Sequence, residues 1–122
     1  SGLSMSKRKY LHFLEDILKA IQSIEQFVNE MDFDSFIGDE KTQRAVEREL
    51  EIIGEAVKNI PEVVTSEYPL IPWKAVAGMR NRLIHHYWNT EVEILWKTIK
   101  KPLPQLKNTI ENMIKSIKRN KQ

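Results

Sequence analysis

The segment GMRNRLIHHYW, residues 78–88, brings together side chains that could act on an anionic group: Arg80, His85, His86 and Tyr87. A guanidinium group can bind two oxygens of a phosphate at once. An imidazole titrates near neutral pH, so it can both accept and donate a proton. This segment is therefore the candidate site of the chain.

Arg80 lies where the helical pattern asks for an apolar residue. At about 100° per residue, six side chains fall within about 60° of it: Trp73, Val76, Ala77, Leu83, Ile84 and Tyr87. An unpaired buried guanidinium costs several kcal/mol. Its stem can pack while its head reaches solvent or pairs with an internal carboxylate, for which Glu49 and Glu55 are the candidates. The alternative is that Arg80 is held in a cleft to bind an anion.

The two histidines bear on whether Arg80 is paired internally or binds an anion. His85 follows Arg80 by five residues, so an ideal helix would separate the two side chains by about 140°. They can share a site only if the helix frays near His85 or if a second copy of the chain completes the cleft. Tyr87 is nearly in line with Arg80. His86 faces elsewhere and is expected to lie in solvent or to contact a ligand.

The elements that position this segment are predicted to be helices. Apolar spacing and the positions of the prolines predict helices over about residues 6–31, 39–60, 73–86 and 103–117, and a short helix from about Thr90. A short helical turn can form between Pro61 and Pro72. Asp39 is the expected cap of the second long helix, and Pro72 the residue before the third. No strand alternation occurs. The fold class predicted is therefore all-α, an antiparallel bundle of four to five helices.

The apolar stripes of the first two long helices predict the core. The first stripe is Tyr10, Leu11, Leu14, Ile17, Leu18, Ile21, Ile24, Val28 and Met31, and the second is Val46, Leu50, Ile53, Val57 and Ile60. The three tryptophans, Trp73, Trp88 and Trp96, are expected in the core or in a dimer interface rather than as stacking platforms for bases.

Composition narrows the function further. The 122 residues contain no cysteine, which excludes disulfides and thiolate chemistry. Residues 1–67 carry 8 Lys/Arg and 14 Asp/Glu, a net −6, whereas residues 68–122 carry 11 and 3, a net +8. The half that contains Arg80 and His85 is therefore the half that would attract a polyanion; the alternative is a solvated basic face with no ligand.

The organisation expected is a single domain, residues 5–122, preceded by a cloning remnant at residues 1–4. No apolar run is long enough to span a bilayer, so a cytoplasmic protein without membrane contact is expected. No cofactor signature occurs. A metal site is not expected either, because the chain has only three histidines and adjacent His85 and His86 point about 100° apart on a helix.

The motif and its neighbours resemble a known family. Arg80, four residues, His85, one residue and Tyr87 match the Arg-x4–6-His-x-Tyr motif of the HEPN superfamily. The words RAVERELEIIGEAVKNIP, IPWKAVAGMRNRLIHHYW and EILWKTIKKPLPQLK resemble its HepT-like branch, the toxin half of HEPN–MNT toxin–antitoxin pairs. The resemblance covers nearly the whole chain from Met5.

The resemblance implies an all-helical homodimer with two motifs facing each other across a cleft. It also implies a metal-independent endoribonuclease, with an MNT-type nucleotidyltransferase antitoxin as partner. In such families the antitoxin can attach adenylate groups to the motif tyrosine, a role that would fall on Tyr87.

The residues suit RNA cleavage. Cutting RNA without a metal needs a base for the 2′-hydroxyl, an acid for the 5′-oxygen and positive charge on the phosphorane. His85 suits the first two tasks and Arg80 the third, with a second copy of each across a dimer. Asn81 is expected to orient the histidine or the substrate. The product predicted is a 2′,3′-cyclic phosphate or 3′-phosphate end.

A second hypothesis belongs to another class. Here the chain is a non-catalytic, nucleotide-binding companion of a separate nucleotidyltransferase, and Arg80 and His85 hold a phosphate that is not cut. The complete Arg-His-Tyr set favours the enzyme, because a simple anion site does not need a titratable group.

Overall fold

The structure is a computed structural model that describes the backbone of residues 2–79 and 90–120 and the side chains of residues 9–79 and 92–119. The described residues form helices joined by turns: α1 Gly2–Phe27, α2 Phe33–Ile37, α3 Glu40–Val57, α4 Glu62–Thr65, α5 Trp73–Ala77, α7 Thr90–Lys100 and α8 Pro102–Asn120. No strand occurs in these ranges, so the predicted all-α class is confirmed.

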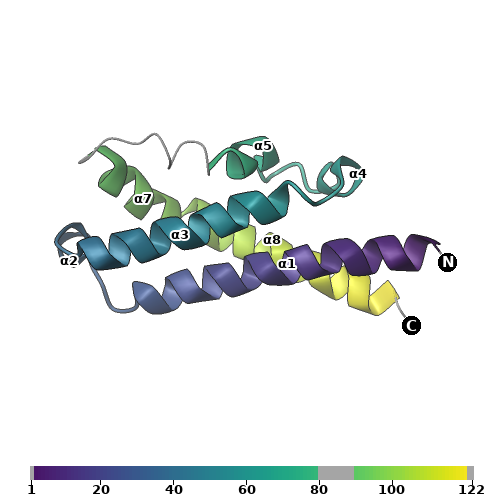
Figure 1. Cartoon of the computed structure of the whole chain (residues 1–122), viewed down its shortest axis with the longest axis horizontal. Helices are drawn as coiled ribbons and strands as arrows, with labels where there is room; N and C mark the ends of the chain where they lie inside the picture. The colour runs from purple at the N-terminus through teal and green to yellow at the C-terminus, as the bar shows by residue number, and fades with distance from the viewer. Residues whose placement is uncertain (1, 80–89, 121–122) are drawn as a thin grey trace.

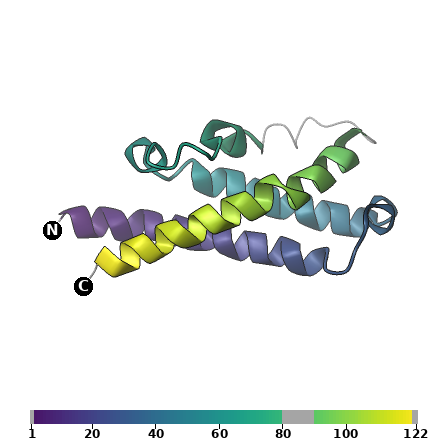
Figure 2. The same ribbon diagram turned by 180° about the vertical axis from the view of Figure 1, so that it is seen from behind.

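The long helices α1 and α3 lie side by side and run in opposite directions (Figure 1). α8 packs against α1, and in the view from behind α7 and α8 form a bent rod that crosses the α1–α3 pair (Figure 2). The short helices α4 and α5 follow the end of α3, and α5 packs against α3. The two chain ends lie at the same end of the bundle (Figure 1).

The apolar stripes meet in the middle of this arrangement, as predicted. Leu14, Ile17, Ile21 and Ile24 of α1 and Val46 and Ile53 of α3 are fully buried. Their partners on α8 include Ile110 and Met113. Tyr10, Leu18 and Met31, at the margins of the first stripe, are half-buried. Burial of these rows is the main source of stability, because it removes the largest apolar area from water.

The first helix differs from its predicted range at both ends. It begins at Gly2 rather than near Ser6, and it ends at Phe27 rather than Met31. Glu30 adopts a left-handed backbone with φ 66°, and the Met31 amide then donates to the Val28 carbonyl over 3.0 Å. A left-handed residue just after a helix closes its last turn. The apolar spacing continues past this point, which is why the pattern alone placed the end too late.

Helix α2 was missed by the sequence prediction, which treated this stretch only as a break. Asp32 caps it: its Oδ1 accepts from the Ser35 amide over 2.8 Å, and Ser35 Oγ accepts from the Asp32 amide over 3.0 Å. This reciprocal pair satisfies two amides that the helix leaves free. An Asp-x-x-Ser spacing was the available signal.

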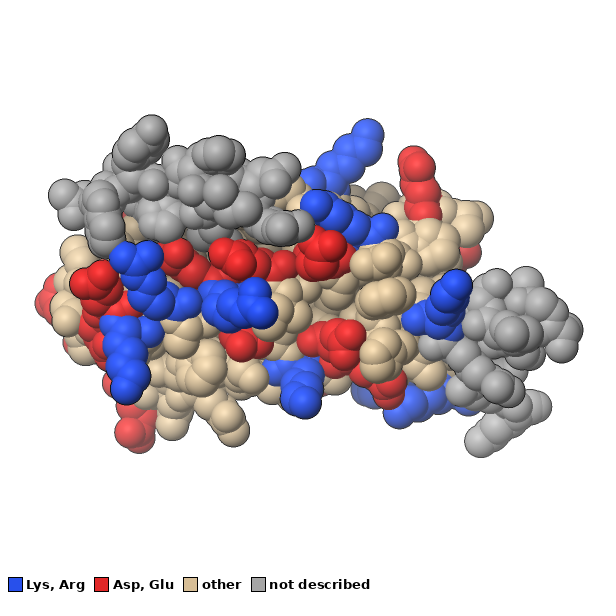
Figure 3. Space-filling view, viewed as in Figure 1, with Lys and Arg blue, Asp and Glu red and all other residues tan. Residues whose placement is uncertain are grey.

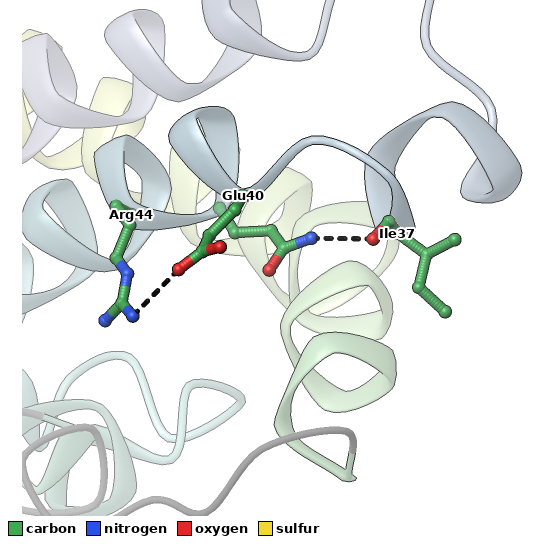
Figure 4. A network of polar contacts seen from close by, with 4 residues as sticks. Ile37, Glu40 and Arg44 are labelled. Carbon is green, nitrogen blue, oxygen red and sulfur yellow. Dashed lines mark hydrogen bonds and ion pairs between the residues drawn. The ribbon is translucent and has the colours of Figure 1, made fainter.

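The buried amide of Gln43 ties α2 to α3. Its Nε2 donates to the carbonyl oxygens of Phe36, over 2.8 Å, and Ile37, over 3.1 Å. Figure 4 shows the second of these bonds beside the exposed Arg44–Glu40 ion pair of α3. Carbonyls at a helix end need partners when they are removed from water. One side chain supplies a partner for two of them.

The predicted cap of α3 and the predicted start of α5 are confirmed, and α8 begins one residue before the predicted Leu103. Asp39 caps α3, with Oδ1 accepting from the Thr42 amide over 3.0 Å. Trp73 opens α5 after Pro72, and Pro102 is the first residue of α8, where a missing amide costs nothing. α3 ends at Val57, three residues before the predicted Ile60.

Candidate functional site

The residues predicted to carry the chemistry, Arg80, Asn81, His85, His86 and Tyr87, lie outside the described residues, as do Trp88 and the rest of residues 80–89. What the structure describes is the framework at both ends of this segment. α5 and Met79 precede it, and α7 begins at Thr90 directly after it. The framework determines where the chain enters and leaves the candidate site.

The entering side is fixed by α5. Trp73, Val76 and Ala77, which the helical wheel placed on the apolar stripe, are half-buried and pack against the core, as does Met79. The indole Nε1 of Trp73 donates to the Tyr68 carbonyl oxygen over 2.9 Å. This stripe is therefore confirmed as far as Ala77, and its continuation lies outside the described residues. The helix predicted over residues 73–86 is interrupted, because α5 ends at Ala77 with Gly78 as its cap.

The leaving side is fixed by α7. Leu95 and Ile99 are buried, and Trp96 stacks at a tilt against Phe36 of α2, with ring centroids 5.0 Å apart. Lys100 Nζ lies 4.5 Å above the Trp96 ring, a cation–π geometry. Trp96 is thus a packing residue, as predicted.

Both sides rest on the same helix, because α5 and α7 each pack against α3. The two candidate ion-pair partners of Arg80 are on α3. Glu49 is half-buried, whereas Glu55 is exposed and lies 4.0 Å from Lys58 Nζ through its Oε2. A pairing of either carboxylate with Arg80 involves a residue outside the described ranges and stays a prediction.

Charged side chains of both signs are intermixed on the face shown in Figure 3. α3 carries ion pairs along its own length, Arg44–Glu40 at 3.1 Å and Arg48–Glu51 at 3.7 Å. Exposed pairs one turn apart contribute only a few tenths of a kcal/mol each. These charged residues form the solvent-exposed side of α3, and its apolar residues form the buried side.

A groove of about 660 Å³ lies between the end of α3, α4 and α5. Its lining is mostly apolar, with Ile60, Pro69 and Trp73 on its walls, and Ala77 at the α5 end. Glu62 and Lys74 supply the charged groups. The sequence prediction missed this groove. The available signal was the segment Pro69–Trp73, in which two prolines favour extended backbone directly before an aromatic residue.

Two other hollows are less suited to a polyanion. A groove of about 440 Å³ between α1 and α3 is lined by Asp16, Glu51 and Glu55 against the single cation Arg48. A smaller hollow of about 200 Å³ contains Tyr10, Tyr68 and Glu67, and none of its described lining residues is basic. Burial, with Glu67 and Tyr68 nearby, raises the pKa of the Tyr10 phenol above its usual value.

Within the described ranges, no group of three or more His, Asp or Glu side chains is arranged to hold a metal ion. The described histidine, His12, is exposed on α1 with its Nε2 3.7 Å from Asp16. It lies one helical turn from that carboxylate and belongs to the surface of the bundle. No described helix is both long and apolar enough to cross a membrane.

The described helices and the sequence of the motif segment are those of an all-α bundle of the HEPN type. Comparison with known proteins shows to which family of this superfamily the chain belongs. The family model described as Ribonuclease HepT-like matches residues 17–113. The chain belongs to this HepT-like family of the HEPN superfamily.

Similar proteins support the same family. The chain is 47% identical over 113 residues to a Methanocaldococcus jannaschii protein named "Putative RNase MJ0127", covering 93% of each chain. It is 50% identical over 109 residues to a Thermococcus cleftensis protein named "Probable ribonuclease HepT", covering 89% of this chain and 99% of the relative. No solved structure matches the chain.

Proposed function

We propose that the chain is the toxin of a HEPN–MNT toxin–antitoxin pair and that it cuts RNA without a metal ion. The observation that carries this proposal is the spacing Arg80-x4-His85-x-Tyr87 in a member of the ribonuclease HepT-like family. The names of the similar proteins, which include RNase or ribonuclease, support the same reaction class.

In the proposed reaction, the 2′-oxygen of a ribose attacks the adjacent phosphorus, and the bond from phosphorus to the 5′-oxygen breaks. One His85 accepts the proton of the 2′-hydroxyl, and another His85 gives a proton to the leaving 5′-oxygen. Arg80 binds the non-bridging oxygens, whose charge grows in the transition state. Asn81 positions the histidine or the substrate. The product ends in a 2′,3′-cyclic phosphate, which water can open to a 3′-phosphate.

A homodimer supplies the second histidine. One imidazole cannot easily serve both as the base for the attacking oxygen and as the acid for the leaving oxygen, because these lie on opposite sides of the phosphorus. In addition, the side chains of Arg80 and His85 would point about 140° apart around the axis of one ideal helix. Two copies facing each other resolve both problems, because Arg80 of one copy can then share a phosphate with His85 of the other. The packing of α5 and α7 on α3 supports such a site by holding both ends of the motif segment.

The proposed partner is a nucleotidyltransferase antitoxin that modifies Tyr87. The phenol oxygen of Tyr87 would attack the α-phosphorus of ATP, and pyrophosphate would leave. The adenylate brings a phosphate, with its negative charge, and a base into the cleft that RNA has to enter. The modified chain is therefore expected to be inactive.

Cleavage in EDTA tests the nuclease. Purified chain is incubated with single-stranded RNA in excess EDTA, beside His85→Ala whose helicity is checked by circular dichroism. Cleavage by the parent but not by folded His85→Ala supports the proposal. Absence of cleavage by both proteins would instead favour the non-catalytic, nucleotide-binding companion, and equal cleavage by both would exclude His85 from the chemistry.

Intact mass tests the modification. After co-expression with a neighbouring nucleotidyltransferase gene, the parent chain is expected to gain whole adenylate units. Tyr87→Phe is expected to gain none. The same gain in both proteins would place the modification elsewhere.

A further inference from the structure

We propose that the groove between α3, α4 and α5 is a subsite for one unpaired base of the RNA, with Trp73 as its stacking wall. The inference rests on the proposed ribonuclease function, because it concerns how that site binds its substrate. The groove measures about 660 Å³, within the range of roughly 300–1,000 Å³ typical of small-molecule sites. Its size suits a base with its ribose.

The wall is rigid and aromatic. Trp73 is half-buried, so part of its ring remains open to the groove while the rest packs on the core. The 2.9 Å hydrogen bond from its Nε1 to the Tyr68 carbonyl fixes the plane of the indole. Stacking of a base on an aromatic ring is worth about 1–3 kcal/mol. A fixed ring loses little conformational entropy when a base binds. This differs from the sequence expectation, which placed Trp73 in the core or in a dimer interface rather than as a stacking platform.

The charges of the groove match a nucleotide. Lys74 is exposed at the edge of the groove, where its ammonium group is accessible to a phosphate. The Glu62 carboxylate lines the same groove and can accept hydrogen bonds from the amino edge of a base. Ser66 donates its hydroxyl proton to the Val63 carbonyl over 3.0 Å, which leaves its oxygen lone pairs to accept.

The chain itself places the groove beside the motif. Ala77 lines the groove, and Arg80 follows it by three residues. Three residues of extended chain span at most about 11 Å. The Cα atom of Arg80 therefore lies within about 11 Å of that of Ala77, so a phosphate bound by Arg80 would be at most a few nucleotides away from a base in the groove. The groove between α1 and α3 lacks this continuity, and its three carboxylates would repel a phosphate.

Single-stranded RNA is the occupant favoured over a protein segment. The rim does carry exposed Val63 and Leu70, 74% and 94% exposed, which a protein partner could cover. The lining itself, however, combines a fixed indole, an exposed ammonium and a carboxylate, which are groups that can bind an unstacked base. Binding of a protein segment is retained as an outcome of the test.

The test measures binding of 2′-O-methyl oligoribonucleotides, which cannot be cleaved through a 2′-hydroxyl, by fluorescence anisotropy at fixed salt. Ala75→Phe is the main variant, because Ala75 is exposed and lines the groove, so a ring there fills the groove without emptying the core. Gln22→Phe, an exposed residue of α1 outside the groove, is the matched control. Both variants are first compared with the parent by thermal unfolding.

We expect Ala75→Phe to weaken binding about tenfold, equivalent to about 1.4 kcal/mol, and to flatten the preference among bases, while Gln22→Phe changes neither. Removing one base from the oligonucleotide should weaken binding by the parent and leave Ala75→Phe unaffected. An Ala75→Phe protein that binds RNA as tightly as the parent would overturn the subsite. The subsite would also be overturned if Ala75→Phe lowered the affinity for the intact strand and for the abasic strand by the same factor. Loss of partner-protein binding with unchanged RNA binding would assign the groove to a protein segment instead.

Cleavage of ordinary RNA separates this inference from the proposed function. If the parent cleaves RNA and Ala75→Phe keeps its affinity and base preference, the subsite is wrong while the nuclease stands. If the parent binds bases in the groove and cleaves no RNA, the subsite stands and the nuclease is wrong.

Discussion

The indole Nε1 of Trp73 donates a 2.9 Å hydrogen bond to the backbone carbonyl of Tyr68, five residues earlier in the chain. α5 has only five residues, and a helix this short has little stability of its own. The bond and the packing of Trp73 therefore hold both the start of α5 and the wall of the adjacent groove. The candidate motif begins three residues after α5 ends.

Replacing Trp73 with Phe should lower the free energy of unfolding by about 1–2 kcal/mol, because one part-buried hydrogen bond and some ring area are lost. Chemical denaturation followed by circular dichroism measures this. Tyr68→Phe is the control, since it keeps the backbone acceptor, and it should cost less than Trp73→Phe. Equal costs would show that the Trp73 bond contributes nothing measurable.

Replacing Gln43 with Leu should lower the free energy of unfolding by about 1–3 kcal/mol. The change removes the two hydrogen bonds that Gln43 Nε2 donates to the carbonyls of Phe36 and Ile37. The Phe36 carbonyl keeps the bond from the Asp39 amide, so the loss falls mainly on the Ile37 carbonyl. Gln26→Leu, at an exposed position of α1, should change stability by no more than about 0.5 kcal/mol. A Gln43→Leu protein as stable as the parent would contradict this account of the α2–α3 junction.

Replacing Phe36 with Ala should cost about 3–5 kcal/mol, because the ring is fully buried against Trp96 and a cavity would remain. The neighbouring Ile37 is 52% exposed, so Ile37→Ala should cost less than about 1 kcal/mol. Denaturant titration of both variants provides the comparison. Similar losses would mean that the α2–α7 contact is not part of the cooperative core.

The cap of α3 should make stability depend on acid. Hydrogen bonds from the Thr42 hydroxyl and then the Thr42 amide hold the pKa of Asp39 below its usual value of 3.8. A carboxyl group with a lowered folded pKa stabilises the protein above its unfolded pKa, and this contribution is lost as the pH falls through the folded pKa.

Asp39→Asn keeps a side-chain acceptor at the cap and removes the titration. The melting temperature of this variant should therefore fall less steeply than that of the parent as the pH is lowered from about 5 to 2. Asp32, whose pKa is lowered by the Ser35 amide and hydroxyl, remains as a second acid-sensitive cap in both proteins. If the melting temperatures of the parent and of Asp39→Asn fall in parallel as the pH is lowered, the ionisation of Asp39 has no role in stability.

On the proposed mechanism, Arg80→Ala should reduce RNA cleavage in EDTA by about 100- to 1,000-fold, the usual cost of losing one transition-state contact to an oxyanion. Arg80→Lys should recover only part of the loss, because a lysine retains charge without the planar fork. Full activity of Arg80→Lys would show that charge alone is needed. Full activity of Arg80→Ala would remove Arg80 from the site.

Local patterns were sufficient for most of the helices. Buried rows such as Leu14 and Ile17 follow from apolar spacing, and the starts at Glu40 and Pro102 follow from a capping carboxylate and a missing amide. Such signals act over one or two turns, so they can be recognised without knowing what lies opposite. Helix ends were less accurate, because the apolar spacing runs on through Glu30, where the backbone turns left-handed.

The sequence by itself determined the all-α class, the cores of the long helices and the motif residues Arg80, His85 and Tyr87 as the place to look for chemistry. Only the tertiary structure decided that Gln43 closes the end of α2, that α5 and α7 both rest on α3, and that Trp73 borders an open groove. The physical reason is the distance along the chain over which each feature is determined. Helix formation depends on neighbours three or four residues apart, whereas a groove or a shared support depends on surfaces that meet only after the chain has folded.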